Sequence, residues 1–223
     1  MVKMKPSCAT GRWVSFGVPF RFFAVVLLVL AAHAGAQPAA PTLLVVGDSI
    51  SAGYGLARGE GWVDLLATRL AEQGHRERVV NASISGDTTA GGRARLPALL
   101  REHRPSIVII ELGGNDALRG GNLQATRENL DAMVAAAQAA HAKVLVVGMK
   151  VPPNYGSAYA RTFDAIFADV AKVRRVPVVP YVFAGFGEDL TQFQGDRIHP
   201  TAAAQPRILD NVWPALSQLL AKR

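Results

Sequence analysis

Short runs of β-branched and aliphatic residues alternate with longer helical patterns from residue 41 onward, and this alternation constrains the fold most. The apolar runs are continuous, which is typical of strands buried on both faces of a parallel sheet. We expect strands at 42–46, 78–81, 107–112, 144–148 and 176–181. Helical spacing predicts helices at 62–73, 92–103, 122–140, 158–174 and 200–220.

Five strands separated by helices predict an α/β fold, a three-layer α/β/α sandwich with a mainly parallel five-stranded sheet. Such sheets bind their ligands at the carboxyl ends of the strands. Three of the predicted strands end in polar clusters, at 47–51, 81–87 and 113–116. We therefore expect these clusters to meet at one edge of the sheet.

Residues 1–36 differ from the rest of the chain. They contain Lys3, Lys5, Arg12 and Arg21 but no acidic residue, and an apolar run at 22–32 precedes Ala34-Gly35-Ala36. This order is typical of a secretory signal peptide cleaved after Ala36. A membrane anchor is the alternative, but the 11-residue run is shorter than the roughly 20 residues that cross a bilayer.

We thus expect a signal peptide at 1–36, one domain at 37–223, a periplasmic or secreted location, and no stable membrane span after processing. Removing residues 1–36 takes away four of the 24 basic residues and leaves 20 against 17 acidic ones. This near-balance argues against a nucleic-acid partner. Cys8, the single cysteine, is also removed, which excludes cysteine nucleophiles, zinc ribbons and iron–sulfur sites.

No cofactor or metal is expected from the motifs. The chain has no phosphate-binding G-x-x-x-x-G-K-[ST] motif and no H-E-x-x-H. Gly53 and Gly55 match the first two glycines of the dinucleotide fingerprint G-x-G-x-x-G, but the third glycine, Gly59, comes one residue too late. Residues 47–51 lack the last glycine of G-x-S-x-G, which argues against the ordinary α/β-hydrolase arrangement.

Ser49 follows the first predicted strand directly, where its hydroxyl suits a nucleophile. A serine nucleophile needs a base that a third group orients. Of the histidines after Ala36, three lie near the ends of predicted helices, where histidine usually contacts terminal carbonyls: His75, His103 and His141. His199 instead lies three residues after Asp196 and just before Pro200, which we expect to begin the last helix.

The Asp196–His199 pair fits two interpretations equally well on spacing alone: two members of a catalytic triad, or a carboxylate at the start of a helix. An acyl-transfer serine also needs donors for the developing oxyanion. The candidates are the backbone N–H groups of Ser49 and Gly86 and the side-chain amide of Asn115. Each candidate alone is an ordinary turn residue.

Together, Gly47-Asp48-Ser49-Ile50, Gly86, Gly114-Asn115-Asp116 and Asp196-x-x-His199 resemble the GDSL, or SGNH, hydrolases. The stretches at 81–89, 111–120 and 152–156 are similar to the family's bacterial periplasmic thioesterase, arylesterase and lysophospholipase group. Ile50 replaces the leucine of the family name.

The resemblance implies a flavodoxin-like fold. It also implies catalysis by Ser49, Asp196 and His199, and an oxyanion hole formed by Ser49, Gly86 and Asn115. The substrates implied are small acyl esters and thioesters, including aryl esters and lysophospholipids.

Leu118, Pro153 and Tyr155 are expected to line the acyl groove, although plain loop packing explains Leu118 and Tyr155 nearly as well. Two other functions remain open. A cell-envelope acyltransferase or deacetylase acting on a sugar or lipid would use the same residues, and a noncatalytic binding module would keep only the fold.

Overall fold

The computed structural model describes residues 1–4, 6, 10–14 and 40–220. The chain divides into two units, Met1–Ala39 and Ala40–Arg223, and all helices and strands described below belong to the second unit. The apolar run and the cleavage site of the predicted signal peptide fall on residues 15–39 and lie outside the described residues.

The second unit contains a five-stranded sheet in which every neighbouring pair of strands is parallel. The strand order is β2-β1-β3-β4-β5. The strands span Thr42–Gly47 (β1), Arg78–Asn81 (β2), Ile107–Glu111 (β3), Lys143–Val147 (β4) and Val178–Val179 (β5). All residues of β1 and β3 are buried, as expected for central strands covered on both faces.

The strand β5 is much shorter than the predicted 176–181. Pro177 and Pro180 flank the two paired residues. Proline has no N–H to donate to the ladder, so pairing stops at each side. The prediction of a six-residue strand was therefore wrong, although the strand itself is present.

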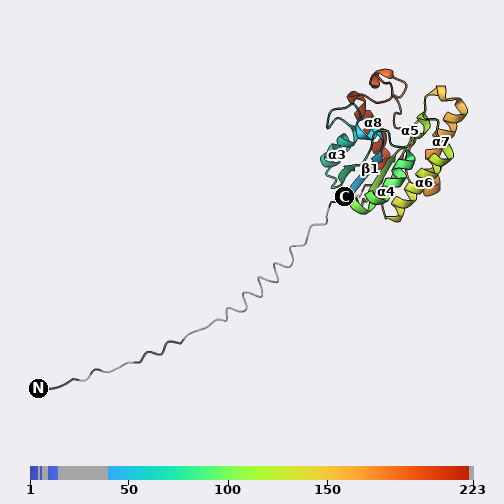
Figure 1. The fold of residues 1–223 in the computed structure, drawn as a ribbon. Helices are drawn as coiled ribbons and strands as arrows, with labels where there is room; N and C mark the ends of the chain where they lie inside the picture. The colour runs from blue at the N-terminus through green and yellow to red at the C-terminus, as the bar shows by residue number, and fades with distance from the viewer. Residues whose placement is uncertain (5, 7–9, 15–39, 221–223) are drawn as a thin grey trace. The chain divides into compact units, whose positions relative to one another are not determined.

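Helices cover both faces of this sheet and complete a three-layer α/β/α sandwich (Figure 1). The α-helices span Ser49–Ala52 (α2), Trp62–Glu72 (α3), Thr89–His103 (α4), Gly114–Leu118 (α5), Leu123–Ala139 (α6), Ser157–Arg174 (α7) and Gln205–Leu216 (α8). Short 3-10 helices span Pro153–Tyr155 (η1), Leu190–Gln192 (η2) and Ala202–Ala204 (η3). α4, α6 and α7 pack side by side on one face, and α3 and α8 pack together on the other.

The last predicted helix, 200–220, is corrected by the structure. Pro200 precedes the helical region and forms an isolated antiparallel bridge with Phe193. Thr201 is the N-cap of η3, and α8 begins at Gln205 with Pro206 in its first turn. Proline suits that first turn because the N–H groups there have no helical partner.

The sequence patterns also missed two short helices. α2 and α5 have four and five residues, too few to show a helical period. Each follows a central strand, β1 or β3, at its carboxyl end. The strand order reverses between β1 and β3, and doubly wound sheets bind their ligands in the crevice outside such a reversal.

Candidate active site

Ser49 is the first residue of α2 and follows β1 through a very tight turn. Asp48 is the N-cap of α2, and its Oδ1 accepts a hydrogen bond from the Ile50 N–H at 3.0 Å. A Cβ atom added at Gly47 would lie 2.7 Å from the Cβ of Ser51. Glycine at 47 therefore permits the close approach that turns the chain from β1 into α2.

His199 contacts Ser49 across 150 positions of sequence. The His199 Nε2 lies 2.8 Å from the Ser49 Oγ, and the His199 Nδ1 lies 2.6 Å from Oδ2 of Asp196. The structure thus brings the serine, the imidazole and the carboxylate into one hydrogen-bonded series. A serine hydroxyl with its proton acceptor and an orienting carboxylate is the arrangement that activates serine in acyl transfer.

Asp196 also shapes the loop that carries His199. Its Oδ1 accepts the backbone N–H groups of Ile198 at 2.9 Å and His199 at 3.0 Å. Partial burial raises the pKa of Asp196, but the hydrogen bonds from the backbone and ring of His199 and from Ile198 outweigh it and lower the pKa to about 2. The carboxylate therefore stays charged at neutral pH beside the imidazole.

The other three histidines after residue 40 lie at the opposite edge of the sheet. His103 is the last residue of α4, His75 follows α3, and His141 follows α6. Each of these helices leads into the amino end of the next strand, whereas Ser49 follows the carboxyl end of β1. This placement separates the three histidines from Ser49.

The three oxyanion-hole candidates lie on segments that follow β1, β2 and β3. Asn115 is the second residue of α5, and its Nδ2 donates to Asp48 Oδ2 at 3.0 Å. Gly86 has φ of +79°, a left-handed conformation that favours glycine. Arg119 donates to the Gly86 carbonyl at 3.0 Å and so connects this loop with the end of α5.

Residues 45–206 match the GDSL-like Lipase/Acylhydrolase family. The chain belongs to this family. It is an ester hydrolase of the GDSL type, because relatives with this activity match most of its length. The resemblance found in the sequence and the predicted fold class are thereby confirmed.

Three curated proteins are similar to this chain over most of their own length. Esterase TesA of Pseudomonas aeruginosa is 54% identical over 82% of this chain and 92% of the relative. Thioesterase 1/protease 1/lysophospholipase L1 of Escherichia coli K12 is 42% identical over 89% of both chains. Arylesterase of Vibrio mimicus is 40% identical over 79% of this chain and 88% of the relative.

Two solved structures share the fold of this chain. A crystal structure of TesA matches with a TM-score of 0.79 and 54% identity, over 80% of this chain and 99% of that one. The psychrotrophic esterase EstA of Pseudoalteromonas, inhibited by monoethylphosphonate, matches with a TM-score of 0.76 and 36% identity, over 79% and 97% of the two chains.

Two buried carboxyl groups near Ser49, those of Asp48 and Glu111, were not singled out by the sequence patterns. Burial raises the pKa of Asp48 to about 6, although bonds from Ile50 and Asn115 oppose this. Burial and the nearby Asp48 raise the pKa of Glu111 well above its usual range. Glu111 ends β3, lies opposite Gly47 of β1, and accepts a 2.7 Å bond from the Ser51 hydroxyl. Both carboxyl groups therefore fasten the turn that carries Ser49.

The predicted acyl-groove residues lie on two neighbouring segments. The Tyr155 hydroxyl donates to the Leu118 carbonyl at 2.8 Å, and its ring stacks on Tyr159 at 6.2 Å between centroids. Pro153 begins η1. These contacts join the end of α5 to η1 and to the first turn of α7, as the alternative of loop packing requires. Contact of these residues with substrate stays a prediction.

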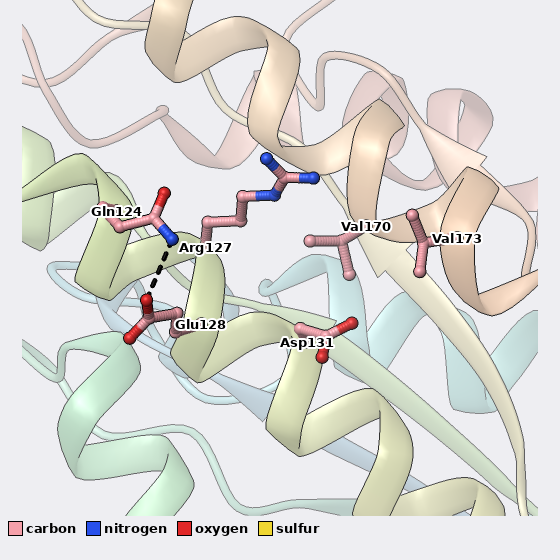
Figure 2. A pocket seen from close by; sticks show the side chains of 6 residues that line it. All are labelled: Gln124, Arg127, Glu128, Asp131, Val170 and Val173. Atoms are coloured by element: carbon pink, nitrogen blue, oxygen red, sulfur yellow. Dashed lines mark hydrogen bonds between the residues drawn. The ribbon is translucent and has the colours of Figure 1, made fainter.

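A surface hollow with a volume of about 230 Å³ lies away from these residues, between α6 and α7 (Figure 2). It is lined by Gln124, Arg127, Glu128, Asp131, Val170 and Val173.

Among the described residues, no group of three or more His, Cys, Asp or Glu side chains is arranged to hold a metal ion. Within the same part of the chain, no helix has the length and apolar character to cross a membrane.

Proposed function

We propose that this chain is a secreted serine esterase that hydrolyses acyl esters and thioesters through an acyl-enzyme on Ser49. The observation that supports this most strongly is the series of hydrogen bonds from Ser49 through His199 to Asp196, at 2.8 and 2.6 Å. The half-buried serine lies at the carboxyl edge of the sheet, where ligands of such folds bind.

In the first step, the Ser49 Oγ attacks the acyl carbonyl while His199 Nε2 takes the hydroxyl proton. Asp196 accepts the Nδ1–H, which holds the imidazole in the tautomer whose Nε2 is free to accept a proton. His199 then gives this proton to the leaving alcohol or thiol. Water attacks the acyl-enzyme with the same histidine as base, and the carboxylic acid is released.

Three donors stabilise the oxyanion in this mechanism: the N–H groups of Ser49 and Gly86 and the amide of Asn115. The Asn115 amide nitrogen carries two protons, and the bond to Asp48 uses one of them. The second proton is then available to the oxyanion, while the bond to Asp48 fixes the plane of the amide. Preorganised donors of this kind stabilise the transition state without reorganisation.

The proposed substrates are small aryl esters, acyl thioesters and lysophospholipids, with Leu118, Pro153 and Tyr155 lining the acyl groove. The names of the relatives, an esterase, a thioesterase/lysophospholipase and an arylesterase, support this range. Replacing Leu118 with alanine tests the groove. We expect kcat/KM to fall more for decanoyl than for acetyl p-nitrophenyl esters, and an equal fall would contradict the assignment.

The deciding experiment is the hydrolysis of p-nitrophenyl butyrate by Ser49→Ala, with Ser83→Ala as a matched control on a neighbouring loop. Loss of a triad nucleophile costs on the order of 10⁶ in kcat. Folded Ser49→Ala with activity within tenfold of the wild type would exclude this mechanism. Adding an acceptor alcohol and measuring the ester product distinguishes hydrolysis from acyl transfer.

We also propose that residues 1–36 direct export to the periplasm or outside the cell and are removed. The support is the basic segment, the apolar run and the Ala34-Gly35-Ala36 site. N-terminal sequencing of the exported protein should then begin at Gln37. An intact Met1 on protein recovered from membranes would support an anchor instead.

A further inference from the structure

The loop after α2 has an unusual backbone. Gly53 and Gly55 have φ of +72° and +76°, both in the left-handed region that favours glycine, and they flank Tyr54. The Tyr54 N–H donates to the Ser49 carbonyl at 3.1 Å. These glycines, which do not fit a dinucleotide motif, thus fold the loop back onto the residue that carries the nucleophile.

Gln194 connects this loop to the loop of His199. Its Nε2 donates to the Tyr54 carbonyl at 2.8 Å and to the Pro200 carbonyl at 3.1 Å. Its backbone N–H donates to the His199 carbonyl at 2.7 Å. One half-buried side chain therefore holds a carbonyl of the loop that follows α2, the helix of Ser49, and a carbonyl of the residue after His199.

The side-chain amide group of Gln194 packs closely against Gly55, in the loop after α2. A Cβ atom added at Gly55 would lie 2.1 Å from Oε1 of Gln194. A side chain at position 55 would therefore displace the Gln194 amide group from its present position. Within residues 40–220, segments 49–58 and 190–201 share two hydrogen bonds, the one from Gln194 to Tyr54 and the one between Ser49 and His199.

We propose that Gln194 is a positioning residue that fastens segment 49–58, which carries Ser49, to its own segment 190–201, which carries His199, and thereby sets the distance between nucleophile and base. The inference rests on the proposed roles of Ser49 and His199. Asp196 orients the His199 imidazole, but the hydrogen bonds of Asp196 go only to Ile198 and His199 and reach no residue of segment 49–58. Gln194 also holds Tyr54, whose ring lies 4.5 Å from the His199 ring between centroids.

The test is Gln194→Glu, which keeps the size of the side chain but replaces the donating NH₂ with an oxygen that faces two carbonyl oxygens. We expect kcat for p-nitrophenyl butyrate to fall by about 10²-fold with little change in KM, because a 1 Å misplacement of reacting groups costs about that much. The matched control is Gln138→Glu, since Gln138 also donates to a backbone carbonyl, that of Arg174 at 2.9 Å. Its kcat should equal that of the wild type.

A pH profile separates positioning from a general loss of stability. When the introduced carboxyl is protonated it can donate again, so the ratio of Gln194→Glu to wild-type kcat should rise as the pH falls from 8 toward 5. Gln194→Met has a similar size and no donor, so its ratio should be low at every pH. Gln194→Met also tests the proposal if the charged variant does not fold.

A second pair of variants disturbs the same contact from the other side. Gly55→Ala and Gly59→Ala both place alanine at a positive φ, of +76° and +90°. Only the alanine at 55 collides with Gln194, because no atom lies within 4 Å of the Cβ added at 59. We expect Gly55→Ala to lose kcat as Gln194→Met does, and Gly59→Ala to retain it.

The outcomes distinguish this proposal from the proposed function. Folded Gln194→Met with the kcat of the wild type overturns the positioning role, while Ser49→Ala remains inactive. Activity retained in Ser49→Ala overturns the function itself. A low kcat in both Gln194 variants, with recovery at low pH in Gln194→Glu alone, supports the proposal.

Discussion

The side-chain amide of Asn115 donates a hydrogen bond of 3.0 Å to Asp48, 67 positions earlier in the chain. This bond joins α5, at the end of β3, to the N-cap of α2, at the end of β1. Asp48 accepts the Ile50 N–H with its other oxygen, so a single buried carboxyl group holds both the turn of Ser49 and the amide of Asn115.

The raised pKa of Asp48 predicts how its contribution to stability depends on pH. Burial raises this pKa from 3.8 to about 6. A carboxyl group with a raised pKa in the folded state favours folding at low pH, and this contribution is lost as the pH rises from about 4 through 6. Asp48→Asn removes the titration, since asparagine does not ionise and is also an N-cap residue.

Relative to the wild type, Asp48→Asn should therefore gain stability between pH 4 and pH 7, by at most about 3 kcal/mol for a shift of roughly two pKa units. Urea unfolding at both pH values measures the change in the difference between the two proteins. The fixed cost of the lost bond to Asn115 cancels in this comparison. A difference that is the same at both pH values would contradict the assigned pKa.

Gly113 is the N-cap of α5, and a side chain at this position should be destabilising. Its φ is +120°, and an added Cβ would lie 3.3 Å from the Phe167 ring. Gly113→Ala should lower the free energy of unfolding by about 1–3 kcal/mol for the backbone strain alone, and more because of the ring. Gly120→Ala is the control, with φ of +64° and no atom near the added Cβ. Equal losses in the two variants would show that the contact with Phe167 does not matter.

Much of the fold was predictable because it depends on local composition. The continuous apolar runs predicted β1 to β4 within a residue at each end, and capping residues such as Asn122 explain where helices begin. The shortening of β5 was also visible in the sequence, since Pro177 and Pro180 cannot donate to a ladder.

The placement of Ser49, Gly86, Asn115 and His199 in one site was expected from the family resemblance, and spacing alone bore only on the pair Asp196 and His199. Asp196 and His199 are three residues apart, and this spacing permits their contact but fits a carboxylate at a helix start equally well. The contacts of Asp48 with Asn115 and of Gln194 with Tyr54 join distant segments, at separations of 67 and 140 positions. Aspartate, asparagine and glutamine are common in turns, and nothing in one sequence shows which of them meet after folding.

Replacing Asp196 separates its role beside the imidazole from its role in the loop. Asp196→Asn retains an oxygen for the N–H groups of Ile198 and His199 but loses the negative charge at Nδ1. We expect kcat to fall by about 10⁴, as for the corresponding change in a serine protease triad. If Asp196 only capped the loop, the variant would keep its kcat, so kcat and melting temperature are measured on the same sample.

Activity should not depend on a metal ion. The proposed mechanism supplies the nucleophile from Ser49 and the oxyanion donors from N–H groups, and these need no Lewis acid. After dialysis against EDTA, kcat for p-nitrophenyl butyrate should be unchanged. A loss of activity that zinc or magnesium restores would contradict the mechanism.

Covalent labelling of the nucleophile tests the proposed mechanism directly. Incubation with a p-nitrophenyl alkylphosphonate, followed by mass spectrometry of the intact protein and its peptides, locates the attacked residue. The mechanism predicts one phosphonyl group per chain, on Ser49, with complete loss of esterase activity. It also predicts no label in Ser49→Ala and very slow labelling in His199→Ala. Full inactivation with the label on another residue, or full activity with Ser49 labelled, would contradict it.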